Sequence, residues 1–324
     1  MLVTGAQIIG DVYGYQSDDN DEVNTVTSLG ASLVNNLIVS GSRNQRIMIW
    51  DADTGEVQRQ CLGHSKVVTS VEFSTDGCKI VSSSNDSLIM VWNVGDGQLI
   101  HTLRGHSSAV LSAVFSYDGQ YIVSGSSDKT IKVWKLLGSD TIDDTITDVH
   151  TLAGHTRAVT SVRVDSSTST IFSGSRDLTI RIWEFTSGNL LKVLTGHTAW
   201  ITSVVIMKDD GQSKLVVSSS RDKTVKIWDT LSGEVVQTLQ GHTGVVTSLA
   251  VAIDDAGVTT IMSGSRDKSV RLWDGVTGNV KSVIQGHASA ITSVGFCNTA
   301  QYGCTIASGS RDKSIRLWDA VTGS

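Results

Sequence analysis

The 324-residue chain contains no proline, so the residue that most often fixes the corner of a β-turn is missing. Pairs such as Asp76-Gly77, Asp118-Gly119 and Ser187-Gly188 supply the turns instead. Cysteine is scarce too: four residues in a chain of this length do not amount to a disulfide framework, and we expect reduced thiols. No stretch approaches the ~18 apolar residues of a membrane helix, and no segment shows a helical hydrophobic period.

The balance of charge limits the class of partner. The chain has 26 Lys and Arg against 32 Asp and Glu, a formal net charge of −6, which disfavours a general polyanion-binding surface but leaves room for a local basic patch. Its first residues, MLVTGAQIIGDVYGY, lack the basic start and the apolar run of a secretory signal. We therefore expect an intracellular protein, in the cytoplasm or the nucleus.

What the chain has in abundance is one repeated segment. Residues Ser263–Asp274 read SGSRDKSVRLWD, and they return almost letter for letter at Ser308–Asp319. Seven copies, some looser, each close on a tryptophan: Trp50, Trp92, Trp134, Trp183, Trp228, Trp273 and Trp318. A Gly-His pair precedes six of them, with its histidine at His64, His106, His155, His197, His242 and His287. Self-similarity at a fixed period predicts a single repeat architecture rather than several unrelated domains.

Each repeat holds four short runs of alternating or β-branched residues. In one of them the runs are Ile201–Ile206, Leu215–Ser220, Thr224–Trp228 and Val235–Leu239, with turn residues between them. Period-2 patterning over four to six residues is typical of strands in an antiparallel sheet. The sequence therefore predicts an all-β protein built from four-stranded sheets.

The Gly-His…Trp-Asp pattern resembles the WD-repeat (β-transducin-like) family, over essentially the whole chain. The resemblance implies a seven-bladed β-propeller in which each repeat supplies the outer strand of one blade and the three inner strands of the next. Because the last repeat lacks an outer strand, we predict that Ala6–Val12 completes the last blade and closes the ring. We assign residues 1–14 to this closing segment of a single domain, 1–324, and blades 1 to 7 to residues 15–51, 52–93, 94–135, 136–184, 185–229, 230–274 and 275–324.

The recurring histidine, aspartate and tryptophan of each repeat are interpreted as a structural network. In the family these groups join a strand Ser or Thr in a buried hydrogen-bond network, and a set repeated in nearly every blade is not a series of catalytic triads. Histidines one blade apart do not converge on a metal ion, so we expect no catalytic residue, no metal and no cofactor. Beyond the histidines and tryptophans already given, this network includes Asp86, Asp128, Asp177, Asp222, Asp267 and Asp312.

Residues that vary between repeats are the better candidates for binding. The resemblance places three positions per repeat on the top face, at the mouth of the channel. The position before the turn aspartate reads Arg43, Asn85, Ser127, Arg176, Arg221, Arg266 and Arg311, so five arginines form an unbroken arc around the closed ring. At the other two positions we single out Trp200, Thr202 and Thr247. Trp200 is the one tryptophan outside the repeat pattern, and tryptophan and arginine are enriched in binding hot spots.

An arc of guanidinium groups suits carboxylate or phosphate, since arginine presents a planar fork of donors. We expect a non-catalytic scaffold or adaptor that docks an acidic or phosphorylated protein segment on this face, as a monomeric propeller or as part of a larger complex. A nucleic-acid- or other polyanion-binding propeller is the alternative, and a propeller enzyme is a further one. Two structural interpretations compete with binding: each arginine could pair with a neighbouring turn aspartate, and Trp200 could pack against a nearby loop.

Two acidic segments depart from the repeat. Residues Ser17-Asp18-Asp19-Asn20-Asp21-Glu22 stand where the first Gly-His pair is expected, and we expect them on the top face beside Arg43 and Arg311. An insertion at Leu137–Val149 carries four aspartates and is expected in a loop on the opposite face. Solvated acidic loops are the competing interpretation of both.

Overall fold

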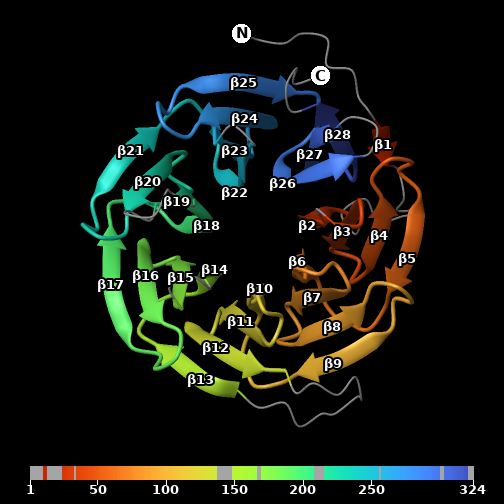
Figure 1. The fold of residues 1–324 in the computed structure, drawn as a ribbon, viewed down its shortest axis with the longest axis horizontal. Helices are drawn as coiled ribbons and strands as arrows, with labels where there is room; N and C mark the ends of the chain where they lie inside the picture. Colours follow the sequence, from red (N-terminus) through yellow and green to blue (C-terminus); the bar gives the residue numbers. More distant parts are fainter. Residues whose placement is uncertain are drawn as a thin grey trace.

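The chain forms a closed ring of seven four-stranded antiparallel sheets around a central channel (Figure 1). The computed structural model describes residues 10–12, 24–32, 34–136, 148–165, 169–207, 215–254, 257–299 and 303–319, and no helix occurs within these ranges. The seven-bladed all-β propeller predicted from the sequence is thereby confirmed.

The strands of each blade follow one another from the channel outward. Blade 1 contains β2 (Val26–Ala31), β3 (Leu37–Ser42), β4 (Ile47–Asp51) and β5 (Val57–Cys61). Blade 2 contains β6 (Val68–Phe73), β7 (Lys79–Ser84), β8 (Ile89–Asn93) and β9 (Leu99–Leu103). Blade 3 contains β10 (Val110–Phe115), β11 (Tyr121–Ser126), β12 (Thr130–Lys135) and β13 (Asp148–Ala153). Blade 4 contains β14 (Val159–Asp165), β15 (Thr170–Ser175), β16 (Thr179–Glu184) and β17 (Leu190–Thr195).

The remaining blades keep the same order. Blade 5 contains β18 (Ile201–Met207), β19 (Leu215–Ser220), β20 (Val225–Asp229) and β21 (Val235–Leu239). Blade 6 contains β22 (Val246–Ile253), β23 (Thr259–Ser265), β24 (Ser269–Asp274) and β25 (Val280–Gln285). Blade 7 contains β26 (Ile291–Thr299), β27 (Gly303–Ser310), β28 (Ile315–Asp319) and β1 (Gly10–Val12). Residues 52–93 thus supply β5 to blade 1 and β6, β7 and β8 to blade 2, which is the one-strand offset that the family geometry implies.

The hydrophobic core lies between the blades rather than inside any one of them. Trp92 of blade 2 packs with Ile49 and Cys61 of blade 1, and equivalent clusters fill the other interfaces. Because each sheet is covered on both faces, the third strand of blade 1 is apolar on both, and residues 47–50 are all buried. At the junction of the two chain ends, Trp50 of blade 1 packs with Leu317 of blade 7. The ring is therefore continuous in its packing.

The N-terminal strand closes the ring. Strand β1 pairs antiparallel with β28, with Gly10 opposite Leu317 and Val12 opposite Ile315 (Figure 1). This confirms the predicted closure for residues 10–12, and residues 6–9 of the predicted strand lie outside the described residues. Pairing β28 covers an edge that would otherwise be open to other chains.

The two acidic segments singled out in the sequence lie mostly outside the described residues. The acidic residues 18–22 and the segment 137–147 lie outside the described residues. Asp148 and Val149 were expected in the inserted loop, and this was wrong, because they begin the outer strand β13. The backbone of Asp148 pairs with Trp134 across a bulge, which extends the sheet into the end of the insertion.

Removing residues 1–12 deletes β1 and leaves β28 as an open edge. We expect the melting temperature to fall by about 2 °C or more, since several strand hydrogen bonds are lost and each kcal/mol lowers Tm by about 2–4 °C in domains of 150–250 residues and by somewhat less in larger ones. Differential scanning calorimetry measures the change, and truncation of residues 1–9 alone, which keeps β1, is the control. An unchanged Tm after removal of all twelve residues would contradict ring closure by this strand.

Candidate functional site

Six blades share a buried chain of hydrogen bonds, and blade 5 shows its parts. Trp228 Nε1 lies 2.7 Å from Ser218 Oγ, Ser218 Oγ lies 2.7 Å from His197 Nε2, and His197 Nδ1 lies 2.7 Å from Asp222 Oδ2. Indole N–H can only donate, so it donates to the serine oxygen. The serine hydroxyl then donates to Nε2, and Nδ1–H donates to the carboxylate. Every polar group in this chain is thereby satisfied.

The turn aspartates are fully engaged by this network. Asp222 Oδ2 also accepts the backbone N–H of Thr198 at 3.1 Å, and Oδ1 accepts the Thr224 hydroxyl at 2.6 Å. Burial alone would raise the pKa of Asp222, but the hydrogen bonds from His197 and Thr224 outweigh it and hold the pKa well below its ordinary value. Such a carboxylate stabilises the fold above the ordinary carboxyl pKa, and this contribution is lost as the pH falls through the depressed one.

The repeated set of serine, histidine and aspartate holds the blades together. Ser218 and its counterparts in the other blades, such as Ser82 and Ser263, have no exposed surface, and their oxygens already accept a tryptophan N–H. A substrate therefore cannot reach these hydroxyls. Blade 1 departs from the pattern, because Asn44 replaces the aspartate and donates to Asn24 at 3.0 Å.

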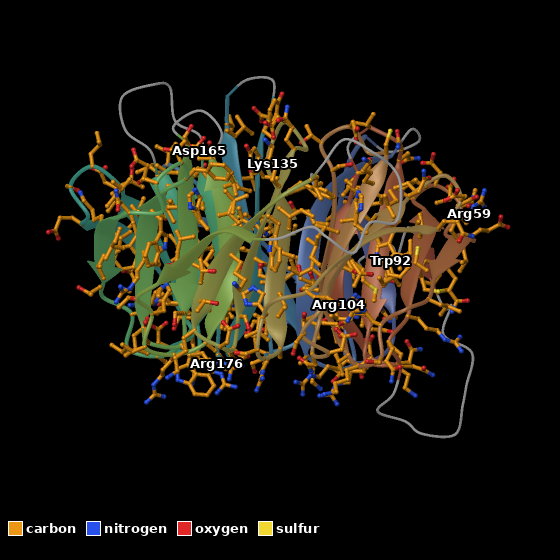
Figure 2. The ribbon with its side chains drawn as sticks, turned by 90° about the horizontal axis from the view of Figure 1, so that it is seen from below. Arg59, Trp92, Arg104, Lys135, Asp165 and Arg176 are labelled. Atoms are coloured by element: carbon orange, nitrogen blue, oxygen red, sulfur yellow. The ribbon has the colours of Figure 1, made fainter. Side chains whose placement is uncertain are left out.

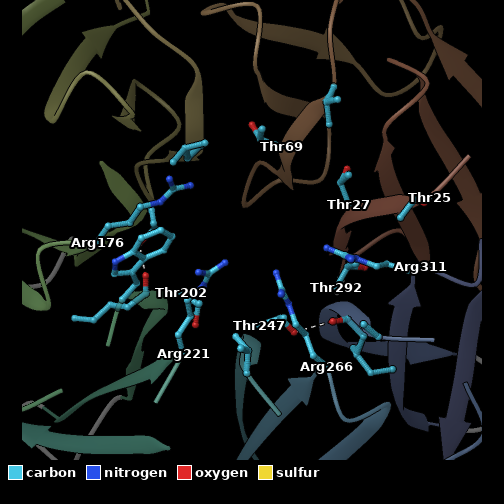
Figure 3. Close-up of a pocket in the computed structure, with 18 of the residues that line it drawn as sticks. Thr25, Thr27, Thr69, Arg176, Thr202, Arg221, Thr247, Arg266, Thr292 and Arg311 are labelled. Carbon is cyan, nitrogen blue, oxygen red and sulfur yellow. Dashed lines mark hydrogen bonds between the residues drawn. The ribbon is translucent and has the colours of Figure 1, made fainter. Parts of the chain in front are cut away.

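All the residues predicted to bind a partner line one cavity at the channel mouth, which we call the arginine well. The well has a volume of about 410 Å³ and opens on the face where Arg104 and Arg176 lie, opposite Lys135 and Asp165 (Figure 2). Figure 3 shows four arginines reaching toward it from neighbouring blades. Its predicted lining residues are Arg43, Arg176, Arg221, Arg266, Arg311, Trp200, Thr202 and Thr247. Asn85 and Ser127, the neutral gap of the arc, do not line it.

Three arginines of the well have no acidic partner in the part of the chain that the structure describes. Arg176, Arg221 and Arg266 form no ion pair there, although each directly precedes a turn aspartate. The reason is that the aspartates point away from the channel, toward the histidines of the buried network, at 2.7–2.8 Å. The interpretation in which turn aspartates neutralise the arc therefore does not hold for these three.

Trp200 ties two of these arginines together. The Arg221 guanidinium carbon lies 4.2 Å from the centre of the Trp200 ring, and that of Arg176 lies 4.9 Å from it. Both distances are in the range of cation–π attraction. The tryptophan is half-buried and lines the well, so it packs against the arginines of the site rather than against a loop elsewhere.

The threonines form the floor of the well and join neighbouring blades. Each innermost strand has a one-residue bulge at this position, for instance between Ile201 and Ser203. Thr202 Oγ1 lies 2.6 Å from the Val246 carbonyl of the next blade, and Thr247 Oγ1 lies 2.8 Å from the Ile291 carbonyl (Figure 3). Their protons are donated within the protein, which leaves only lone pairs for a ligand.

Comparison with known protein families agrees with this geometry. The family described as "WD domain, G-beta repeat" (WD40) matches the chain at residues 17–51, 55–93, 97–135, 146–184, 188–229, 233–274 and 278–319. The chain belongs to the WD40 family. No curated protein matches it. WD40 propellers commonly act as non-catalytic scaffolds for protein interactions.

The opposite half of the WD40 channel holds an ion pair that the sequence analysis missed. Glu72 of β6 and Arg163 of β14 face each other across it, with 3.8 Å between Oε2 and Nη1. Burial raises the pKa of Glu72, and the charge of Arg163 opposes this. A signal existed in the sequence, because the same position in the other repeats holds only glycine, alanine or valine.

Other kinds of site find no support in the described part of the WD40 propeller. No group of three or more His, Cys, Asp or Glu side chains there could hold a metal ion. None of the described segments is a helix long and apolar enough to cross a membrane.

Replacing Asp222 with alanine tests the network. We expect the free energy of unfolding to drop by about 2–4 kcal/mol, because His197 Nδ1 and the Thr198 N–H lose a buried acceptor. Urea denaturation at neutral pH measures the loss. Asp229→Ala removes a half-buried carboxylate at the other end of the same blade, whose hydrogen bonds from Leu231 and Ser232 are exposed to solvent, and it should cost less. Equal losses in the two variants would show that the network does not hold the blade.

Proposed function

We propose that the protein is a non-catalytic interaction scaffold that docks an acidic or phosphorylated segment of a partner protein in the arginine well. One observation carries the proposal: Arg176, Arg221 and Arg266 converge on a single cavity without an acidic partner among the described residues. Like charges held together repel, and a bound anion removes this cost. The planar forks of arginine can each give two parallel hydrogen bonds to phosphate or carboxylate.

The surroundings of the arginines favour an anion held in one place. Cation–π contact with Trp200 restricts the Arg176 and Arg221 side chains, so less conformational entropy is lost when a ligand binds. The threonine floor donates its protons elsewhere, so recognition falls to the guanidinium groups. A recessed mouth whose charged lining, among the described residues, is positive also raises the local concentration of anionic partners.

Binding of a phosphoserine peptide tests the function. The other seven tryptophans are at most 2% exposed, so a change in tryptophan fluorescence on binding would report on Trp200. We expect the peptide Gly-Gly-phosphoserine-Gly-Gly to bind. Arg221→Gln and Arg266→Gln should each raise Kd at least about tenfold, which corresponds to the free energy of one hydrogen bond to a charged group. Arg104→Gln and Arg157→Gln remove exposed arginines outside the well and should leave Kd unchanged.

Three outcomes would overturn the proposal. The peptide could fail to bind, it could bind equally to the Arg221 and Arg266 variants, or the two control variants could weaken it as much. Single-stranded RNA is titrated in parallel at the same ionic strength. If RNA binds more tightly than the peptide and is lost in the same variants, the well serves nucleic acid and not a peptide.

A further inference from the structure

Two lysines lie just outside the arginine well on the same face. The turn from the second to the third strand reads Arg221-Asp222-Lys223 in blade 5 and Arg266-Asp267-Lys268 in blade 6. Because the strands of a blade follow one another outward from the channel, each such turn runs outward too. Its arginine lines the well, and its lysine, which is exposed, does not. The basic surface therefore extends radially over these two blades, on the face where Figure 2 shows Arg176.

The carboxylates between these basic residues do not cancel the charge at the surface. Asp222 and Asp267 are about nine-tenths buried and bind His197 and His242 at 2.7 and 2.8 Å. Lys223 and Lys268 form no ion pair with another group in the described ranges. A strip of positive charge therefore runs from the well to the start of the third strand in both blades.

The backbone at these lysines allows a clean substitution. Lys223 and Lys268 have φ values of 70° and 72°, in the left-handed region where glycine is the favoured residue. Replacing either lysine with glycine removes a charge and relieves backbone strain at once. A loss of binding in such a variant cannot then be attributed to a damaged turn.

Blade 3 supplies a matched control. Lys129 occupies the same turn position with a φ of 76° and is also exposed. The residue on the channel side of its turn is Ser127, which does not line the well. Lys129 therefore has the same charge and backbone conformation as the two lysines but lies outside the strip.

We propose that the docked segment does not end in the well but continues outward over the turns of blades 5 and 6, so that Lys223 and Lys268 contact further carboxylates along it. This inference rests on the proposed function and narrows its ligand to an extended polyacidic segment with one anionic group in the well. Arginines line the well and lysines lie outside it, which fits this ligand. The planar fork of arginine suits one closely held anion, and the flexible lysine side chain suits a series of loosely held carboxylates.

Two sets of peptides test the footprint. The short probe is Gly-Gly-phosphoserine-Gly-Gly, and the long probes carry a run of glutamates added to either end of it. We expect one of the long probes to bind the wild-type protein more tightly at low ionic strength, with the gain disappearing at high salt. Lys223→Gly and Lys268→Gly should each reduce that gain about two- to five-fold, as removal of a surface ion pair does. Lys129→Gly should leave it intact, and the short probe should bind all three variants as it binds the wild type.

Failure of this inference can be told apart from failure of the proposed function. If the short probe binds through Arg221 and Arg266 but neither long probe gains affinity, or the gain survives in both lysine variants, the segment ends in the well. A gain that falls equally in the Lys129 variant shows diffuse attraction rather than a defined strip, and it overturns the inference too. Calorimetry of the three glycine variants should show melting temperatures no lower than the wild type.

Discussion

A chain of four polar groups buried in apolar surroundings is stable only when every donor and acceptor is satisfied, and six blades of this propeller depend on that condition. Tryptophan, serine, histidine and aspartate satisfy one another in that order, through hydrogen bonds of 2.7–2.8 Å. The network ties the loop that carries Gly-His to the turn that carries aspartate, and so connects the outer strand of one blade with the inner strands of the next. An incomplete network would leave a charged carboxylate or an imidazole nitrogen unpaired in the core. The free-energy cost of burying that unpaired group is larger than the net gain from one hydrogen bond of the network.

The charge of the arginine well, the proposed binding site, follows from how the network uses its aspartates. A carboxylate bound to histidine, to a backbone N–H and to a hydroxyl has little left to offer the arginine that precedes it. Each arginine is attached to the end of a second strand, near the channel, and closure of the ring brings arginines from successive blades to one mouth. Residues about 45 positions apart in the sequence thereby become neighbours, and the charge that the network does not neutralise accumulates at the well.

Repetition in the sequence was enough to predict the sheets, the propeller, the buried network and the membership of the arginine arc, because each depends on residues that recur at a fixed register. Features that depend on the directions of side chains could not be predicted from the repeats. The contacts of Trp200 with Arg176 and Arg221 depend on where three side chains from two blades meet, and Thr202 donates its proton to the next blade from a bulge that the sequence does not reveal. The ion pair between Glu72 and Arg163 joins blades that are not adjacent in the ring, and only the geometry of a closed channel brings them together. The start of β13 inside the insertion was missed because strand pairing with β12 outweighs the local loop composition.

We propose that the repeated residues hold the ring together, while the arginines at the position that varies between blades bind the partner. A crystal structure of the protein with Gly-Gly-phosphoserine-Gly-Gly tests it most directly. The account predicts the phosphate in the well, within hydrogen-bond distance, about 2.7–3.0 Å, of the guanidinium groups of Arg221 and Arg266. Phosphate bound at the outer strands or on the face of Lys135 and Asp165, with the well unchanged, would contradict it.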